Sequence, residues 1–504
     1  MQTLIEPQDS YNETLIDNVH PSDWTNPTPD GTYNLVVIGA GTAGLVCAAG
    51  AAGLGAKVAL IERHLMGGDC LNVGCVPSKG LLGPAHLIGR AREGRDMGLL
   101  LKDGYDVDFP GLMERMRRIR AQISHHDSAT RFRDLGIDVF IGEGRFTGPD
   151  RIAVDDQELR FKKAVVATGA RAAAPPIPGL DQVEYLTNET VFSLTEVPRR
   201  LGIIGAGPIG CEMAQAFASF GAEVTLIEAM HGVLPNEDPD ASVYVKDALE
   251  RSGVQVLCCG KNVEIQNRNG GIHLVLSAHE QPYDVEVDRV LVAVGRAPNI
   301  DSLNLEAANI KAHKKGVEVN DRLQTSNPNV FAAGDVASKY QFTHAADFMA
   351  RIVIQNALFK GRSKASALTI PWCTYTNPEL AHVGLNPTTA KEVGVEIDTY
   401  TQPFDAVDRS MLEGETEGFV RVHTRKGTDT LVGATIVGAY AGDMIPELVL
   451  AITHKIGLGK IASTIHPYPT RAEAIRRIGD QYNRTRLTPT VKKWMTRWLS
   501  WQRS

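Results

Sequence analysis

The first clear pattern of apolar and polar positions begins at residue 35 and consists of an apolar run, a glycine-rich turn, a stretch of small residues and a second apolar run. The first run, residues 35–38, precedes the turn GAGTAG, and the second run occupies residues 57–61. Such β-branched runs bounded by turns predict buried parallel strands. Residues 34–56 carry no charge, but their six glycines argue against a membrane span. The pattern therefore predicts a strand, helix, strand unit.

The same pattern returns near the middle of the chain. An apolar run at residues 201–204 leads into GAGPIG, an apolar helix follows, and a further run at residues 224–227 ends at Glu228. A strand, three spaced glycines and an acidic residue about 20 positions later form the fingerprint of a dinucleotide-binding unit. Two copies predict an α/β protein that binds two dinucleotides.

Each residue of the fingerprint has a physical task. In the first copy Gly39 permits the tight turn, Gly41 lets the backbone approach a pyrophosphate, and Gly44 lets the helix pack on the sheet. The helix N-terminus then attracts the phosphates, and Glu62 can accept ribose hydroxyls. The equivalent residues of the second copy are Gly205, Gly207, Gly210 and Glu228.

The acidic residue of the second copy bears on the choice of nucleotide. A carboxylate at Glu228 repels the additional phosphate of NADPH and so favours NADH. The following segment, residues 229–231, contains no arginine, although a protonated His231 would partly offset the carboxylate.

Composition and charge narrow the class of protein. The chain has 504 residues, is 43% hydrophobic and 22% charged, and is long enough for several domains with full cores. Its net charge of −7 argues against a nucleic-acid-binding protein. Seven cysteines are an odd, sparse set, unlike a secreted disulfide framework, and the first residues resemble no export signal. A reducing, cytoplasmic location is therefore expected.

Two cysteines lie in a glycine-rich segment, GGDCLNVGCVPSK, just before a predicted helix start. Cys70 and Cys75 have a spacing compatible with a disulfide, and a thiolate there gains from the helix dipole and from nearby Lys79. Inert packing and metal ligation are the alternatives, but zinc prefers four ligands and no second pair lies nearby in the sequence. Beside two nucleotide sites, a redox couple is the favoured interpretation.

At this point the sequence strongly resembles the class I pyridine nucleotide-disulfide oxidoreductases, the flavoenzyme group of lipoamide dehydrogenase, glutathione reductase and mercuric reductase. The resemblance runs from about residue 34 to about residue 479. Beyond the two fingerprints and the thiol segment, it rests on ATGA at 167–170, AVGRAPN at 293–299, NVFAAGD at 329–335 and YTNPELAHVGL at 375–385. It implies two Rossmann-like dinucleotide-binding domains plus a C-terminal α+β dimerisation domain, and a homodimer whose active site is shared between chains.

The resemblance also implies roles for individual residues. The first fingerprint would hold FAD and the second NAD(P)H, and family members of the mercuric reductase type favour NADPH. Cys75 would face the flavin as the charge-transfer thiol, Cys70 would meet the substrate, and Lys79, paired with Glu212, would lie near flavin N5. Asp335 would bind the ribityl chain. The other implied cofactor-binding residues are Ala43, Gly68, Gly144, Thr168, Gly169, Gly295 and His344.

The domain boundaries follow from the motifs and the resemblance. We expect an N-terminal arm at 1–33, an FAD-binding domain at 34–180, an NAD(P)H-binding domain at 181–298, a central segment completing the FAD domain at 299–368, a dimerisation domain at 369–480, and a tail at 481–504. In the tail, Trp494, Trp498 and Trp501 share one helical face among basic residues. This pattern fits contact with an anionic membrane surface or packing on the dimer.

A motif near the C-terminus argues against a disulfide as the electron acceptor. Disulfide-reducing relatives carry a catalytic His five residues before a Glu, whereas here Tyr468 precedes Glu473 and His466 lies two residues earlier. A tyrosine, with a pKa near 10, is a poor base at neutral pH. Mercuric reductases share this tyrosine, and soft Hg(II) suits the thiolates of Cys70 and Cys75, with Tyr468 as a further ligand or hydrogen-bond donor. The leading hypothesis is reduction of Hg(II) to Hg(0).

Three features leave alternatives open. Asp69 replaces the usual threonine and would raise the thiol pKa of Cys70 or help to hold a cation. The mercuric enzymes end in a cysteine pair, which this chain lacks, and Cys258-Cys259 are expected on a strand as packing. A lipoamide dehydrogenase-like or quinone-reducing enzyme using His466, and a membrane-associated redox sensor or metal-sequestering protein, are the competing functions.

Overall fold

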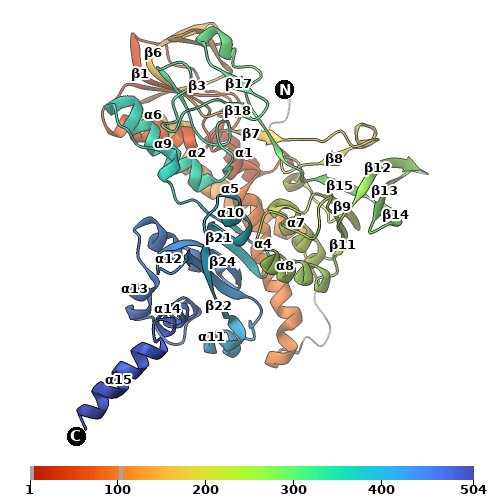
Figure 1. Ribbon diagram of the computed structural model, residues 1–504. Helices are drawn as coiled ribbons and strands as arrows, with labels where there is room; N and C mark the ends of the chain where they lie inside the picture. Colours follow the sequence, from red (N-terminus) through yellow and green to blue (C-terminus); the bar gives the residue numbers. More distant parts are fainter. Residues whose placement is uncertain (1–4, 101–105, 269, 504) are drawn as a thin grey trace.

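The computed structural model describes residues 5–100, 106–268 and 270–503. Residues 1–4 of the predicted arm and residue 504 of the predicted tail lie outside these ranges. The chain forms the α/β architecture that the sequence predicts, with a mixed sheet whose central strands are parallel, a second sheet that is parallel throughout, and a separate antiparallel sheet in the C-terminal part (Figure 1). The helices are α1 (Ser10–Val19), α2 (Thr42–Gly53), α3 (Gly68–Asn72), α4 (Cys75–Glu93), α5 (Phe109–Ser124), α6 (Ala129–Asp134), α7 (Pro208–Ser219), α8 (Pro239–Arg251), α9 (Thr343–Phe359), α10 (Pro387–Glu392), α11 (Asp408–Leu412), α12 (Ala441–Thr453), α13 (Leu458–Ser463), α14 (Glu473–Thr485) and α15 (Pro489–Trp501).

The first sheet contains the first fingerprint. Its strands, in spatial order, are β3 (Ile137–Ile141), β2 (Val58–Glu62), β1 (Thr32–Ile38), β6 (Gln157–Val166), β5 (Arg151–Val154) and β4 (Gly144–Gly148), and β19 (Val330–Ala332) pairs in parallel with β6. Leu35 and Val37 pack with α2 and α9 on one face, and Val36 and Ile38 face the opposite cluster. This burial of both faces explains the continuous apolar run.

The second sheet contains the second fingerprint and is entirely parallel. Its order is β11 (Gln255–Leu257), β10 (Glu223–Ile227), β9 (Arg200–Ile204), β15 (Arg289–Val292) and β8 (Tyr185–Leu186). Helices α7 and α8 cover one face. The other face packs against an antiparallel sheet of β12 (Lys261–Arg268), β13 (Gly271–Ala278) and β14 (Gln281–Val287). Between the two large sheets, β7 (Ala170–Ala172) pairs with β16 (Arg296–Pro298).

The C-terminal part folds around a five-stranded antiparallel sheet. Its order is β20 (Pro371–Thr374), β21 (Glu379–Gly384), β24 (Leu431–Gly438), β23 (Phe419–Arg425) and β22 (Ile397–Pro403). Helices α12, α13 and α14 pack on this sheet through an apolar cluster that includes Leu448, Ile475 and Ile478. A short hairpin of β17 (Ala312–His313) and β18 (Gly316–Val317) completes the strands of the described residues.

The two ends of the described chain differ in how they pack. Helix α1 lies within the predicted arm and buries Leu15 and Val19, and its cap residue Asp9 pairs with Arg117 of α5. At the other end α15 protrudes from the body (Figure 1) and buries none of its side chains. Among the described residues, none of the helices is both long enough and apolar enough to cross a bilayer.

Candidate functional site

The two glycine-rich turns have the same close-packed geometry. A Cβ atom at Gly44 would lie 1.8 Å from the carbonyl oxygen of Gly39, and one at Gly210 would lie 1.9 Å from that of Gly205. Any side chain at Gly44 or Gly210 would therefore push its helix off the sheet. At Gly207 a Cβ would meet no atom within 4 Å, which leaves open space beside the start of α7. The turns thus combine tight helix packing with room for a ligand at the helix N-terminus.

The acidic residue that closes each unit binds back to its own turn. Glu62 Oε2 accepts a hydrogen bond from the backbone N–H of Ala40 at 2.7 Å, and Glu228 Oε2 accepts one from Ala206 at 2.8 Å. Burial raises the pKa of Glu62. Each carboxylate oxygen has a second lone pair, so both residues keep the capacity to accept ribose hydroxyls.

The predicted flavin residues of the first unit line a common cavity. Gly39, Glu62, Gly144 and Thr168 surround a space of about 50 Å³ at the carboxyl ends of the first sheet's strands. The N-cap residue of α2, Gly41, provides no side-chain hydrogen bond to the first turn of that helix. The backbone N–H groups there are thus available to an anion, as a pyrophosphate requires. These residues fit the adenosine and pyrophosphate parts of FAD.

Arg296 links Asp69, which lies inside the dithiol segment, to Asp335 of the NVFAAGD motif. Arg296 forms ion pairs with Asp69 and, at 3.4 Å, with Asp335. Burial raises the pKa of Asp335, and the Arg296 guanidinium opposes that rise. The carboxylate of Asp69 is therefore engaged by the Arg296 guanidinium.

The two thiols lie at the junction of α3 and α4, and both are free. Cys75 begins α4, and its Sγ lies 3.3 Å from Thr343 Oγ1 at the start of α9. A hydrogen bond from Cys70 lowers the pKa of Cys75 to about 6, with further help from Thr343 and Lys79. The same hydrogen bond, together with burial, raises the pKa of Cys70. The hydrogen bond between the two sulfurs therefore favours ionisation of Cys75 over Cys70.

Lys79 follows Cys75 by one helical turn and forms an ion pair with a buried acid. Its Nζ lies 2.8 Å from Glu212 Oε2, and the Glu212 side chain is only 4% exposed. Glu212 Oε1 also accepts the backbone N–H of Tyr375 at 2.9 Å, and the Lys79 ammonium lies 4.7 Å from the centre of the Tyr375 ring. Lys79 is thus fixed on the same side of α4 as Cys75.

The C-terminal candidates lie in the third part of the fold. Tyr468 is 69% exposed, and its hydroxyl donates to Asp408 Oδ2 at 2.8 Å, which raises the phenol pKa. Glu473 begins α14 and pairs with Arg476 and Arg477 at 3.1 Å each. Within the described residues of one chain, the side-chain hydrogen bonds and ion pairs of Tyr468 and Glu473 are made with Asp408, Arg476 and Arg477, and not with Cys70 or Cys75.

The remaining predicted residues occupy distinct places. His466 is nearly buried, with Nε2 2.9 Å from Glu447 Oε1. His344 donates from Nε2 to the carbonyl oxygen of Pro371 at 2.6 Å, which ties α9 to β20. Gly169 and Gly295 have φ values of +65° and +88°, at the turns that precede β7 and β16. Ala43 is buried in α2, with its Cβ facing Gly334.

Sequence reasoning missed three contacts of the site. Thr343 bonds the Cys75 sulfur, Arg296 joins Asp69 to Asp335, and Asp408 binds Tyr468. Arg296 belongs to the AVGRAPN motif, so its position carried a signal. No spacing rule connects Thr343 with Cys75 or Asp408 with Tyr468, because the partners come from distant parts of the chain.

Comparison with known proteins assigns the family. Residues 33–350 match the pyridine nucleotide-disulphide oxidoreductase family, and residues 370–478 match its dimerisation domain. The chain belongs to this family. The resemblance inferred from the motifs is thereby confirmed, and family membership implies FAD and a pyridine nucleotide as cofactors.

Relatives within the family are named for different activities. A mercuric reductase from Staphylococcus aureus is 37% identical over 89% of this chain and 82% of its own length. A dihydrolipoyl dehydrogenase from Bacillus subtilis is 35% identical over 87% of this chain and 94% of its own length. Because these identities are similar, they select neither acceptor.

A solved structure has the same fold. The copper(II) complex of the HOCl-induced flavoprotein disulfide reductase RclA from Escherichia coli superposes with a TM-score of 0.79 at 28% identity, over 90% of this chain and all of that chain. The chain is therefore a flavoprotein disulfide reductase in architecture.

Proposed function

We propose that the protein is a homodimeric enzyme of the mercuric reductase type, which passes electrons from a nicotinamide nucleotide through Cys70 and Cys75 to a thiophilic metal ion. The observation that carries this proposal is the phenol of Tyr468, whose pKa is raised by its bond to Asp408. A group that titrates above its usual value near 10 cannot serve as a base near neutral pH. A metal ion held by two thiolates needs no such base, because no sulfur leaving group has to be protonated.

The residues of this chain divide the work as follows. FAD, when bound, supplies the two-electron chemistry that links a nicotinamide to the thiols. The exposed Cys75 and the partly buried Cys70 provide two soft sulfur ligands, which suit Hg(II). Lys79 keeps a positive charge beside Cys75, and Glu212 holds that charge in place. Binding of Hg(II) would displace the Cys70 proton to solvent. Oxidation of the nicotinamide nucleotide would then supply the two electrons that convert Hg(II) to Hg(0), and both sulfurs would be left as thiolates.

The dimer completes this site in our proposal. The chain carries the family's dimerisation domain at residues 370–478, and Tyr468 and Glu473 belong to it. We place Tyr468 of one protomer opposite Cys70 and Cys75 of the other. The exposure of Tyr468 in a single chain supports this arrangement.

Glu228 supports NADH as the electron donor. Its carboxylate is fixed to Ala206 and, through Oε1, to the N–H of Met230 at 2.9 Å. A fixed negative charge at this position repels the 2′-phosphate of NADPH. Seven free cysteines fit a reducing, cytoplasmic setting.

Replacing Tyr468 with histidine is expected to create the missing base. Reduction of lipoamide should rise by about 100-fold, since a well-placed general base contributes roughly 10²–10⁴-fold. Reduction of Hg(II) should not rise. Steady-state turnover of the purified holoenzyme with Hg(II), lipoamide and a quinone, each with NADH and with NADPH, measures these effects.

Tyr468→Phe is the matched control, because it keeps the ring and supplies no base; its lipoamide turnover should stay at the unmodified level. Rapid lipoamide turnover by the unmodified enzyme that is lost in His466→Asn would instead favour the dihydrolipoamide dehydrogenase-like alternative. That alternative is supported by the ion pair of His466 with Glu447 and by the dihydrolipoyl relatives. If NADH reduced the bound flavin but no acceptor was turned over, a redox sensor would be favoured.

We further propose that α15 contacts anionic membrane surfaces. Trp494, Trp498 and Trp501 are 69%, 58% and 68% exposed on a helix that protrudes from the body (Figure 1). Each basic residue near an anionic surface contributes about 1 kcal/mol of attraction. Lys492→Gln/Lys493→Gln should therefore weaken binding to vesicles of phosphatidylglycerol by about 30-fold.

Co-sedimentation with phosphatidylglycerol and phosphatidylcholine vesicles measures this effect. Lys314→Gln/Lys315→Gln, an exposed lysine pair far from α15 in the sequence, removes the same charge and should leave binding unchanged. Equal binding of all three proteins to both kinds of vesicle would contradict membrane contact through α15.

A further inference from the structure

The second parallel sheet brings together three metal-ligating side chains that the flavin and dithiol site does not use. His231 follows β10, and Cys258 and Cys259 follow β11 directly. Because β10 and β11 are neighbouring parallel strands, their carboxyl ends meet at one edge of the sheet. The sequence-based expectation that Cys258 and Cys259 lie on a strand is wrong, since β11 ends at Leu257, whereas the expected burial is found at Cys258.

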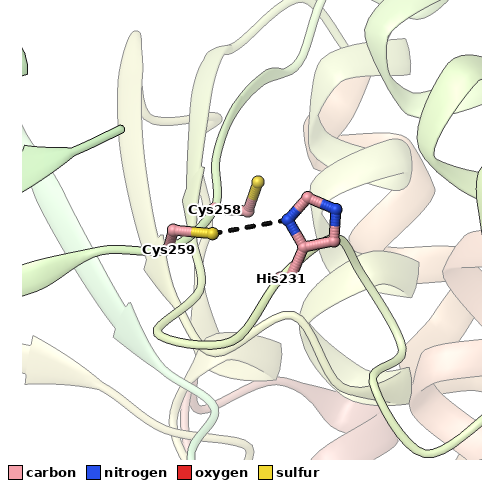
Figure 2. Close-up of side chains that lie close together, drawn as sticks. All are labelled: His231, Cys258 and Cys259. Carbon is pink, nitrogen blue, oxygen red and sulfur yellow. Dashed lines mark hydrogen bonds between the residues drawn. The ribbon is translucent and has the colours of Figure 1, made fainter. Parts of the chain in front are cut away.

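The ligand atoms of these residues are close enough to share one ion. His231 offers a ring nitrogen and the cysteines offer sulfurs, and all three atoms lie within 4.8 Å of one another. His231 Nδ1 lies 3.4 Å from Cys259 Sγ, and the imidazole and the two thiols converge in Figure 2. Around a tetrahedral zinc ion, nitrogen and sulfur ligands lie about 3.6 Å apart. The observed separation is thus that of two ligands on one ion.

A second histidine supports the buried thiol. His279, in the turn between β13 and β14, places Nε2 3.2 Å from Cys258 Sγ. Its ring meets that of His231 edge-on, with centroids 6.4 Å apart. His279 therefore orients Cys258 from the outside of the cluster, as second partners of metal ligands commonly do.

Burial and charge suit a bound cation. Cys258 is buried, Cys259 is half-buried and His231 is exposed, so the cluster is closed on one side and open to solvent on the other. Cys258 and Cys259 are adjacent in the chain and their sulfurs lie within 4.8 Å of each other, so a cation between them would offset the repulsion of two neighbouring thiolates. The open side leaves room for a fourth ligand such as water.

We propose that His231, Cys258 and Cys259 form a binding site for one thiophilic d¹⁰ cation, such as Zn(II) or Hg(II), at the edge of the nucleotide-binding sheet. Two sulfurs and one imidazole are the ligand set that such ions prefer, and they exclude Mg²⁺ and Ca²⁺. The site is separate from Cys70 and Cys75 and does not rest on the proposed acceptor.

The site also connects with the nucleotide fingerprint. The backbone N–H of Cys259 donates to the carbonyl oxygen of Met230 at 2.8 Å, and the N–H of Met230 donates to Glu228 Oε1. An ion that joins His231 to Cys259 would therefore fix both ends of the loop that positions the Glu228 carboxylate. Metal binding would therefore restrict the same loop that holds Glu228.

Zn(II) binding to the TCEP-reduced holoprotein with Cys70→Ser/Cys75→Ser tests the proposal, because this background removes the competing thiols and all thiol-dependent turnover. We expect one Zn(II) per chain, measured by chelator competition and elemental analysis. Adding Cys258→Ser/Cys259→Ser should weaken binding by at least roughly 100-fold. His279→Gln should weaken it by about 10–100-fold, the usual effect of a second partner.

Two controls keep the result decisive. Adding Cys47→Ala removes a buried cysteine far from the cluster and should leave Zn(II) affinity unchanged. The variant with Cys258→Ser/Cys259→Ser could fail to fold, as judged by its FAD content. In that case His231→Asn, which alters only an exposed ligand, should lower Zn(II) affinity by at least tenfold. Unchanged Zn(II) affinity in His231→Asn and in the cysteine variant, or a Cys258–Cys259 disulfide that persists under TCEP, would overturn the site.

Discussion

Replacing Cys75 with serine is expected to lower metal-ion turnover by roughly three orders of magnitude or more, as the loss of a reacting nucleophile typically does. Serine keeps the size and the hydrogen-bonding capacity of the side chain, but a hydroxyl does not ionise at neutral pH. The variant therefore loses the thiolate whose pKa lies at about 6. Steady-state reduction of Hg(II) by the purified holoenzyme measures the effect.

Cys373→Ser is the matched control for this result. Burial raises the pKa of Cys373, and its sulfur donates to the carbonyl oxygen of Thr374 at 3.5 Å, so it remains an inert thiol. Its replacement should change turnover by less than about tenfold, since surface and packing thiols lack thiolate character. FAD content and anaerobic reduction by NADH should be normal in both variants. Retention of a tenth of the turnover in Cys75→Ser would rule out electron transfer through this sulfur.

Replacing Lys79 with methionine is expected to reduce the free energy of unfolding by about 3 kcal/mol, because it leaves the buried Glu212 carboxylate without its cation. Methionine retains the aliphatic stem that packs in α4. The backbone N–H of Tyr375 remains as a partner for Glu212, which limits the loss. Denaturant unfolding of the holoprotein, followed by tryptophan fluorescence and by FAD release, measures the change.

Adding Glu212→Gln to Lys79→Met should restore part of this free energy, since no unpaired charge then remains. Arg251→Met is the comparison at an exposed pair, where both Arg251 and Glu417 are 50% exposed. That change should cost no more than about 1 kcal/mol. Equal losses for Lys79→Met and Arg251→Met would mean that the Lys79–Glu212 pair has no special role in stability.

The parts of this structure that sequence predicts are those with a local, repeated pattern. The residue order of both fingerprints requires the backbone contacts found at Gly44 and Gly210, because each contact closes within six residues. The Cys75 and Lys79 spacing likewise follows from one helical turn. The α/β class and the two nucleotide units follow from such patterns.

The parts that sequence does not predict depend on contacts between distant segments. Asp69 meets Arg296 from more than 200 positions away, and Thr343 reaches Cys75 across a similar separation. Helix α1 also escaped prediction, because only Leu15 and Val19 of its short, polar sequence are buried as apolar residues. The metal cluster was missed for a different reason, since it depends on β11 ending at Leu257 and on its pairing beside β10.

A close contact between two glycines, beside the hydrogen bond from the Gly67 N–H to the Ala40 carbonyl oxygen at 2.8 Å, joins the fingerprint turn to the segment that carries the thiols. A Cβ atom at Gly68 would lie only 2.7 Å from the Cα of Gly41, so the backbone of α3 rests directly on the turn before α2. The methyl group of an alanine at Gly68 would force these two backbones apart and so displace Cys70. The spacing between the thiol segment and the first fingerprint turn is thus fixed by direct contact of two backbones, with no side chain between them to adjust.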